Sequence, residues 1–222
     1  MERTHRISIH SPLQGEWKVL RPPGHHRYAL DFVQWDGRTK AAHAASKLAY
    51  YVARVPSSSF FCWNKPVFAP IDGVVIQVGN GWPDNEYVNI WQAIRLWLNA
   101  TFKFRPKEEG GRLDIRPNAG NYLMIQASEG YVVFLAHLKN QSVAVADGAK
   151  VRRGDVVGMV GSSGNSTMPH LHINLFDQVE DPFRAKVLPF VFTRYMTRDG
   201  NERWVDNEAT IPSTGEVVQF DA

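Results

Sequence analysis

Short runs in which apolar and polar residues alternate dominate the chain, and turn-forming residues separate them. Residues 121–126 and 131–137 alternate in this way around Ser128, Glu129 and Gly130, so we expect an antiparallel hairpin there. Similar strand-like runs lie at residues 28–33, 156–160, 187–196 and 216–220. The pattern therefore predicts a mainly β protein.

A pattern that contains an Asp-Gly turn occurs twice. The segment VFAPIDGVVIQV, residues 67–78, predicts two short strands joined around Asp72 and Gly73. Residues 143–160 contain a second Asp-Gly pair, followed by Gly-Asp and an apolar strand. Two such units indicate an internally repeated β architecture, either a folded-over sandwich or a half-barrel.

One part of the chain departs from this β pattern. Apolar residues in 85–104 recur near the helical period and predict an amphipathic helix, and residues 37–55 have a similar but weaker pattern. We expect residues 84–117 to form a helical and loop insertion within a single domain that spans residues 1–222. Aromatic residues at such spacing are more typical of core packing than of a ligand platform. We expect the insertion to line or cover the functional site.

The composition is that of an ordinary globular protein, with 44% hydrophobic and 21% charged residues. The net charge of +3 mildly favours anionic partners, but the Lys and Arg residues are scattered, so we expect no nucleic-acid binding. The single cysteine, Cys62, cannot form an internal disulfide and leaves the redox compartment open. The beginning of the sequence lacks the apolar stretch of a signal peptide, and no run is long enough to span a bilayer.

The segment with the clearest candidate functional residues is 154–177, GDVVGMVGSSGNSTMPHLHINLFD. This stretch predicts a buried strand, a loop of Gly, Ser and Asn, and a second strand that begins with His-Leu-His. Side chains alternate along a strand, so His170 and His172 point to the same face while Leu171 points away. Two imidazoles directed at one spot suit a metal ligand beside an acid/base group, although two solvated histidines on an exposed strand would have the same sequence.

Two other strands offer residues of the same kind. Asp31 lies within an apolar strand and follows His25 and His26, and His137 ends the strand at 131–137. A buried carboxylate needs a partner, which is either an arginine such as Arg27 or a metal ion. Catalytic zinc takes three N or O ligands and keeps a fourth position for water, and cysteine is absent from the set. These residues together predict a catalytic Zn²⁺ site.

Three segments in this order resemble the lysostaphin-type zinc metallopeptidases. They are APIDGVV at residues 69–75, YVVFLAHL at 131–138 and VRRGDVVGMVGSSGNSTMPHLHINL at 151–175. The resemblance implies a small all-β core built as a duplicated hybrid motif, a folded antiparallel β-sheet sandwich, with the site in a groove across the sheet. It also implies cleavage of peptide bonds in the cross-links or stems of peptidoglycan, and a location in the cell envelope or outside the cell.

The resemblance assigns roles to individual residues. It implies that Asp31 and His172 are zinc ligands and that His137 and His170 are the catalytic histidines. The first ligand is less clear, because Arg27 stands where the family has a histidine, four residues before the aspartate. If the segment were a regular strand, alternation would put His25 on the same face as Asp31 and favour it as the ligand. A turn or bulge would allow His26 to be the ligand instead. We expect the chain to bend before Asp31 and take His26 as the first ligand, with His25 as the alternative.

The sequence thus predicts a zinc metalloendopeptidase that acts on peptidoglycan or a related peptide through a metal-activated water. The alternative is an inactive family member that serves as a cell-wall-binding or regulatory module, a possibility that Arg27 raises. A carrier domain is less consistent with the sequence, because it needs only one phosphorylatable histidine or one exposed lysine.

Overall fold

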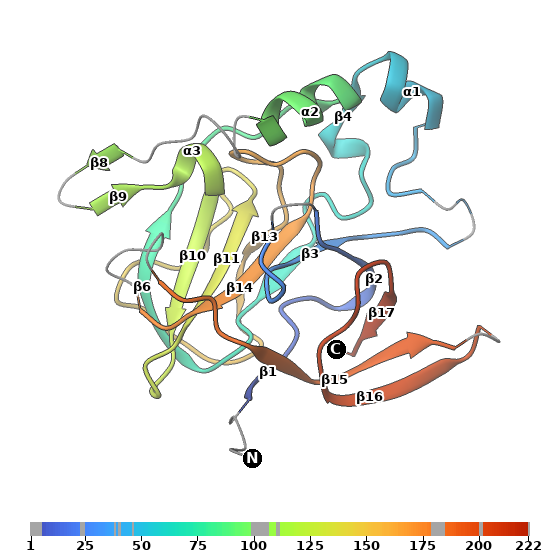
Figure 1. The fold of residues 1–222 in the computed structure, drawn as a ribbon. Coiled ribbons are helices and arrows are strands. Elements are labelled where there is room, and N and C mark those ends of the chain that lie inside the picture. The colour runs from blue at the N-terminus through green and yellow to red at the C-terminus, as the bar shows by residue number, and fades with distance from the viewer. Residues whose placement is uncertain are drawn as a thin grey trace.

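An eleven-stranded sheet forms the centre of the protein, which is described here by a computed structural model (Figure 1). The structure describes residues 6–22, 25–37, 39, 41–45, 47–98, 107–109, 112–178, 185–199 and 202–221. The strands of the sheet are β1 (Ile7–Ile9), β2 (Gly15–Leu20), β3 (Leu30–Val33), β6 (Gly73–Gly79), β10 (Asn121–Gln126), β11 (Val132–Leu138), β12 (Lys150–Val151), β14 (Leu171–Phe176), β15 (Phe190–Arg198), β16 (Trp204–Thr210) and β17 (Val217–Phe220). The predicted mainly β fold is confirmed.

The strand order is β1-β15-β17-β2-β3-β14-β11-β10-β6-β12, and β16 pairs with the other side of β15. Apart from the parallel pair of β1 and β15, neighbouring strands are antiparallel. The predicted hairpin of residues 121–126 and 131–137 is present as β10 and β11. Their apolar residues are buried on both faces of the sheet, because Leu123 and Leu135 join the main core while Met124 and Phe134 join a smaller cluster on the opposite face.

Smaller elements surround this sheet. Three two-stranded sheets pair β4 (Val55–Pro56) with β7 (Tyr87–Val88), β5 (Pro66–Phe68) with β13 (Val156–Met159), and β8 (Lys107–Glu109) with β9 (Arg112–Asp114). The described helices are α1 (Lys47–Val52), α2 (Ile90–Leu98) and α3 (Arg116–Ala119), with a 3-10 turn, η1, at Ser57–Ser59. Among the described residues, no helix has the length and apolar character needed to cross a membrane.

The predicted hairpin at residues 67–78 is wrong. β5 pairs with β13, whereas β6 pairs with β10 and β12, so the two strands separate on either side of the turn. The backbone groups between them bond to other segments: the amide of Ala69 donates to the carbonyl of Asp155, and the Ala69 carbonyl accepts from the amide of Gly154. Pro70 follows and has no amide to offer a ladder.

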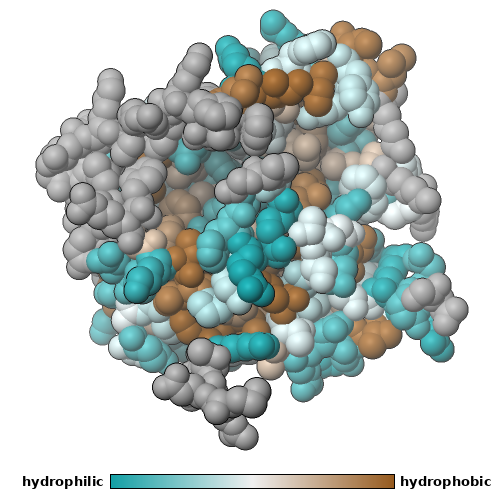
Figure 2. Space-filling model, in the orientation of Figure 1, coloured by the Kyte–Doolittle hydropathy of each residue, from teal (hydrophilic) through white to brown (hydrophobic). Residues whose placement is uncertain are grey.

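The two longer helices lie side by side near one end of the sheet (Figure 1). α2 lies within the predicted helix at 85–104 and α1 within the weaker pattern at 37–55, and apolar side chains stand exposed over both, as Figure 2 shows. Residues 107–116, expected as a loop, instead contain β8 and β9. Residues 99–106 and 110–111 lie outside the described part, so the bounds of an insertion at 84–117 remain a prediction.

Candidate metal and catalytic site

The pairing of β3 with β14 brings two predicted ligands together. Asp31 lies directly opposite His172 in this antiparallel pair, so the two side chains share a face of the sheet. The Nδ1 atom of His172 lies 2.7 Å from Oδ1 of Asp31, and Asp31 is only 3% exposed. Residues 141 positions apart in the chain thus form one contact.

A turn before β3 brings His25 to the same carboxylate. The amide of Ala29 donates to the carbonyl of His26, so the chain bends as expected between His25 and Asp31. As a result, Nε2 of His25 lies 3.4 Å from Oδ2 of Asp31. His25, Asp31 and His172 each offer one ligand atom, and these atoms all lie within 4.8 Å of one another. Two imidazole nitrogens and one carboxylate oxygen form a donor set that fits Zn²⁺.

His26, the first choice from the sequence, does not lie in this group. Its Nδ1 accepts a hydrogen bond from the amide of Tyr28 at 3.3 Å, and its ring packs against the Tyr28 ring. The exposed His26 side chain thus belongs to the turn itself. Because the chain turns at residues 26–29, strand parity does not decide between the two histidines, and the turn itself brings the alternative, His25, to Asp31.

Asn174 fixes the orientation of the His172 ring. Nε2–H of His172 donates to Oδ1 of Asn174 at 3.0 Å, which leaves Nδ1 directed at Asp31. Burial is the largest single effect on His172 and opposes its protonation, but the hydrogen bond and charge of Asp31, together with the hydrogen bond to Asn174, raise the pKa of the imidazole overall. A divalent cation competes with this proton for the Nδ1 lone pair. Sequence reasoning missed Asn174, although its position two residues after His172 places it on the same face.

The electrostatics of Asp31 depend on the histidines around it. Burial favours the neutral carboxyl group, yet the neighbouring His170, His172 and His25 hold the pKa of Asp31 well below its usual range. The carboxylate is therefore ionised at neutral pH although it is buried. An ionised, buried carboxylate with three imidazoles around it is a strong site for a cation.

His170 directs its Nε2 atom at the same place. Its Nδ1–H donates to the carbonyl of Met168 at 2.7 Å, and Oγ of Ser166 lies 3.1 Å from the same nitrogen. Its Nε2 lies 3.6 Å from Oδ2 of Asp31. With Nδ1 committed to the backbone, Nε2 keeps a lone pair for proton transfer.

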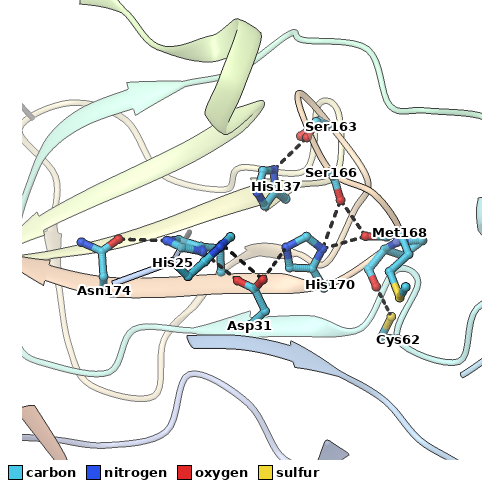
Figure 3. Close-up of polar contacts among 11 residues, drawn as sticks. His25, Asp31, Cys62, His137, Ser163, Ser166, Met168, His170 and Asn174 are labelled. Atoms are coloured by element: carbon cyan, nitrogen blue, oxygen red, sulfur yellow. Dashed lines mark hydrogen bonds and ion pairs between the residues drawn. The ribbon is translucent and has the colours of Figure 1, made fainter. Parts of the chain in front are cut away.

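A β-bulge turns His137 toward the site. Leu123 pairs with Leu135, but Asn121 pairs with Leu138, so β11 carries one extra residue there. Ala136 pairs with His172 and faces the site, so a regular strand would send His137 to the opposite face. Instead His137 adopts φ 61°, and its ring centre lies 4.7 Å from that of His170 (Figure 3). Bulges commonly redirect a side chain in this way beside functional sites.

The environment keeps His137 neutral. Its Nδ1–H donates to the carbonyl of Ser163 at 2.9 Å, so Nε2 carries the lone pair. Burial, reinforced by His170 and His172, holds the pKa of His137 well below its usual value. The structure thus brings together His25, Asp31, His137, His170 and His172, and leaves only His26 outside.

Residues 161–166, which we call the site loop, hold the two catalytic candidates, His137 and His170, in place. Asn85 Nδ2 donates to the carbonyls of Ser162, Gly164 and Ser166 at 2.7, 3.2 and 3.3 Å. Oδ1 of Asp84 accepts from the amide of Ser162 at 2.8 Å. No sequence pattern reveals these contacts, because they join side chains to backbone groups far along the chain.

Gly164 permits the site loop to pack against the start of β10. It adopts φ 67°, and a Cβ there would lie 2.2 Å from the amide nitrogen of Gly120. Only glycine therefore fits at this position.

The fold and the site define a β-rich protein with a His–Asp cluster able to hold a metal ion beside two further histidines, His137 and His170. Residues 110–182, which contain three of these histidines, match the model of Peptidase family M23. The predicted resemblance is confirmed, and this segment carries the sequence of that family.

Curated relatives match this chain over segments of 53 to 59 residues. The chain is 42% identical over 59 residues to the peptidoglycan DD-endopeptidase ShyA of Vibrio cholerae, covering 27% of this chain and 13% of that protein. It is 47% identical over 53 residues to the DD-carboxypeptidase/endopeptidase Mpg of Neisseria meningitidis, covering 24% and 12%. The chain thus spans about an eighth of the length of these relatives.

Solved structures are similar at low identity. The catalytic domain of lysostaphin from Staphylococcus simulans is 17% identical, with a TM-score of 0.41 over 78% of this chain and 88% of that one. The catalytic domain of the prophage-encoded M23 protein EnpA from Enterococcus faecalis is 16% identical, with a TM-score of 0.42 over 83% and 93%. The family assignment rests on the sequence match.

Proposed function

We propose that this protein is a zinc-dependent peptidase that hydrolyses peptide bonds of peptidoglycan. The observation that carries the proposal is the cluster of His25, Asp31 and His172 beside His137 and His170. Three of these five residues lie in residues 110–182, the segment that matches the peptidase family model, which supports the proposal. Relatives named as peptidoglycan endopeptidases support the substrate class.

His25, Asp31 and His172 would hold the zinc ion. When bound, zinc supplies Lewis-acid polarisation of the scissile carbonyl and lowers the pKa of water near it. Asp31 provides the negative charge of the ligand set, and Asn174 keeps Nδ1 of His172 directed at the ion. This role for Asn174 is the same as that of other hydrogen-bond partners of metal-binding histidines.

The chain's own acid/base groups complete the reaction. His137 is neutral and buried, so its Nε2 can accept the proton of the attacking water and return it to the leaving amine. Nε2 of His170 faces the same space, and the two rings are close enough to contact one small group together. Once protonated, either imidazole can donate a hydrogen bond to the developing oxyanion.

Two wider assignments belong to this proposal. The protein would act in the cell envelope or outside the cell, where its substrate lies, and residues 1–222 would form one peptidase domain. The alternative, an inactive wall-binding module, is less well supported because His25 supplies the ligand that Arg27 cannot.

Metal content and hydrolysis of purified peptidoglycan test the proposal in the same set of variants. Wild type and His26→Ala are expected to bind about one zinc per chain, whereas His25→Ala, Asp31→Ala and His172→Ala each lose the metal and more than about 100-fold in rate. His26→Ala is the matched control, because it removes an adjacent imidazole that lies outside the cluster.

His137→Ala and His170→Ala separate chemistry from metal binding, since they should keep the zinc and lose activity. A wild-type protein that binds no zinc after reconstitution would contradict the proposal and favour the wall-binding module.

A further inference from the structure

A pocket continues the site along the same face of the sheet. In the antiparallel pair of β2 and β3, Leu20 lies opposite Asp31, and Lys18 lies opposite Val33. Directly opposed residues, and residues two apart in a strand, share a face. The face that carries Asp31 thus also carries Leu20, which lies opposite it, and the next pair along the strands, Val33 and Lys18.

These residues form the floor of a cavity of about 370 Å³, large enough for a small ligand. Its walls come from the segment around α1 and from the site itself. The lining side chains besides the floor are Trp35, Ala41, Ala42, His43, Tyr50, Tyr51, Phe60 and Met168. Met168 connects the pocket to the site, because its carbonyl accepts the hydrogen bond from His170.

The pocket is apolar except at two points. Lys18 is the charged lining residue, and its Nζ lies 4.1 Å from the centre of the Trp35 ring. His43 packs between Tyr50 and Phe60, and its Nδ1 is buried without a hydrogen-bond partner among the described residues. Aromatic walls favour an apolar group, while the ammonium group at Trp35 favours an anion.

We propose that this pocket binds the part of the substrate next to the scissile bond, and that it selects a group with an apolar stem and a carboxylate. The inference rests on the proposed peptidase function, since it takes the pocket as a continuation of that site. The stem packs against Tyr50, Phe60 and Met168, and the carboxylate pairs with Lys18. His43 offers one further polar contact inside the pocket.

Hexanoate and 1-hexanol are suitable probes, because they share an apolar stem and differ in charge. In protein labelled at the methionine methyl groups with ¹³C, both probes should shift the Met168 signal, which Met168→Leu identifies by its loss. Lys18→Gln should weaken hexanoate binding about threefold to tenfold and leave 1-hexanol binding unchanged. Lys150→Gln, an exposed lysine on β12 at the far edge of the sheet, is the control.

Peptidoglycan hydrolysis gives the second readout. Lys18→Gln should raise KM with little change in kcat or zinc content, because the residue contacts neither the metal cluster nor the catalytic pair. A wild type that fails to cleave peptidoglycan, but binds hexanoate at Met168 in a Lys18-dependent way, would overturn the proposed function and leave the pocket supported. The pocket proposal alone would be overturned if the wild type is active but hexanoate does not shift its Met168 signal. The same holds if the wild type is active and Lys18→Gln leaves the hexanoate affinity unchanged.

Discussion

His137 carries its side chain on a left-handed backbone conformation, which an L-residue adopts at a cost of about 1–2 kcal/mol. The bulge in β11 imposes this conformation, and in return the imidazole faces His170 and not the opposite side of the sheet. Strain at a functional position is tolerated when the surrounding structure holds it. Here the hydrogen bond to the carbonyl of Ser163 does so.

Two substitutions at this residue separate the side chain from the backbone. His137→Gly and His137→Ala both remove the imidazole and should abolish activity, but the glycine variant should be the more stable by about 1 kcal/mol, because glycine accepts φ 61° without strain. Urea unfolding of both variants measures the difference. Equal free energies of unfolding would mean that the bulge relaxes when the imidazole is absent.

At the same scale, the sequence predicted the residues whose placement follows from strand alternation, and it was less informative where the chain is irregular. Alternation sufficed to put His170 and His172 on one face. The choice between His25 and His26 depends on the turn at residues 26–29, which brings His25 to Asp31. Which of the two is the first metal ligand stays a prediction. The direction in which His137 points depends on a bulge that the residue types in this segment do not predict.

Among the elements, the site loop shows how a segment outside the chemistry can set its geometry. Asn85 begins the stretch predicted as an insertion, yet its amide supports the three carbonyls of the site loop. The carbonyl of Ser163 in turn orients His137, and Ser166 contacts His170. The beginning of the predicted insertion therefore supports the site directly, whatever the rest of it does.

Asn85→Ala should leave buried carbonyls without donors, at a cost of about 1–3 kcal/mol. We expect a lower kcat with zinc content retained, because the site loop positions the two catalytic candidates and none of the three proposed ligands. The matched control is Asn89→Ala, which removes the side chain that accepts from the amide of Gln92 near the start of α2. It should cost about 1 kcal/mol and spare kcat. An unchanged kcat in Asn85→Ala would show that the site loop holds its shape without this contact.

The failed hairpin at residues 67–78 belongs to this scale as well. Its Asp-Gly turn has the right local chemistry, but pairing partners elsewhere in the chain satisfy the backbone of β5 and β6 better. Local turn signals predicted the pairing of β10 with β11 correctly, although each of these strands also pairs with a second strand, β6 or β14. Periodicity thus identified these strands, whereas their long-range pairing partners could not be predicted from it.

Across the whole molecule, the proposed metal would connect β3, β14 and the turn that precedes β3. An ion that binds only the folded chain stabilises it by about 2.7 kcal/mol when its concentration is 100 times the dissociation constant. For a chain of this size that corresponds to a rise in Tm of about 5–10 °C. Differential scanning fluorimetry with and without a chelator measures it, and Asp31→Ala should show no rise.

The zinc-dependent rise in Tm should become smaller as the pH falls. Asp31 raises the pKa of His172, so in the metal-free protein a proton occupies Nδ1 up to a higher pH than in a free histidine. Because this pKa is raised above the ordinary value of about 6.5, protons should begin to compete above that pH, and the zinc-dependent rise in Tm should shrink as the pH falls toward and below it. A rise that is the same at about pH 8 and about pH 5.5 would mean that His172 is not a ligand.

The pairing of β3 with β14 also delays the assembly of the site during translation. Asp31 leaves the ribosome before its partner His172, which follows 141 residues later. A nascent chain that ends before His172 contains only His25 and Asp31 of the proposed ligands, and it lacks the strand that holds them in place. The proposed metal site would therefore stay incomplete until translation has passed His172.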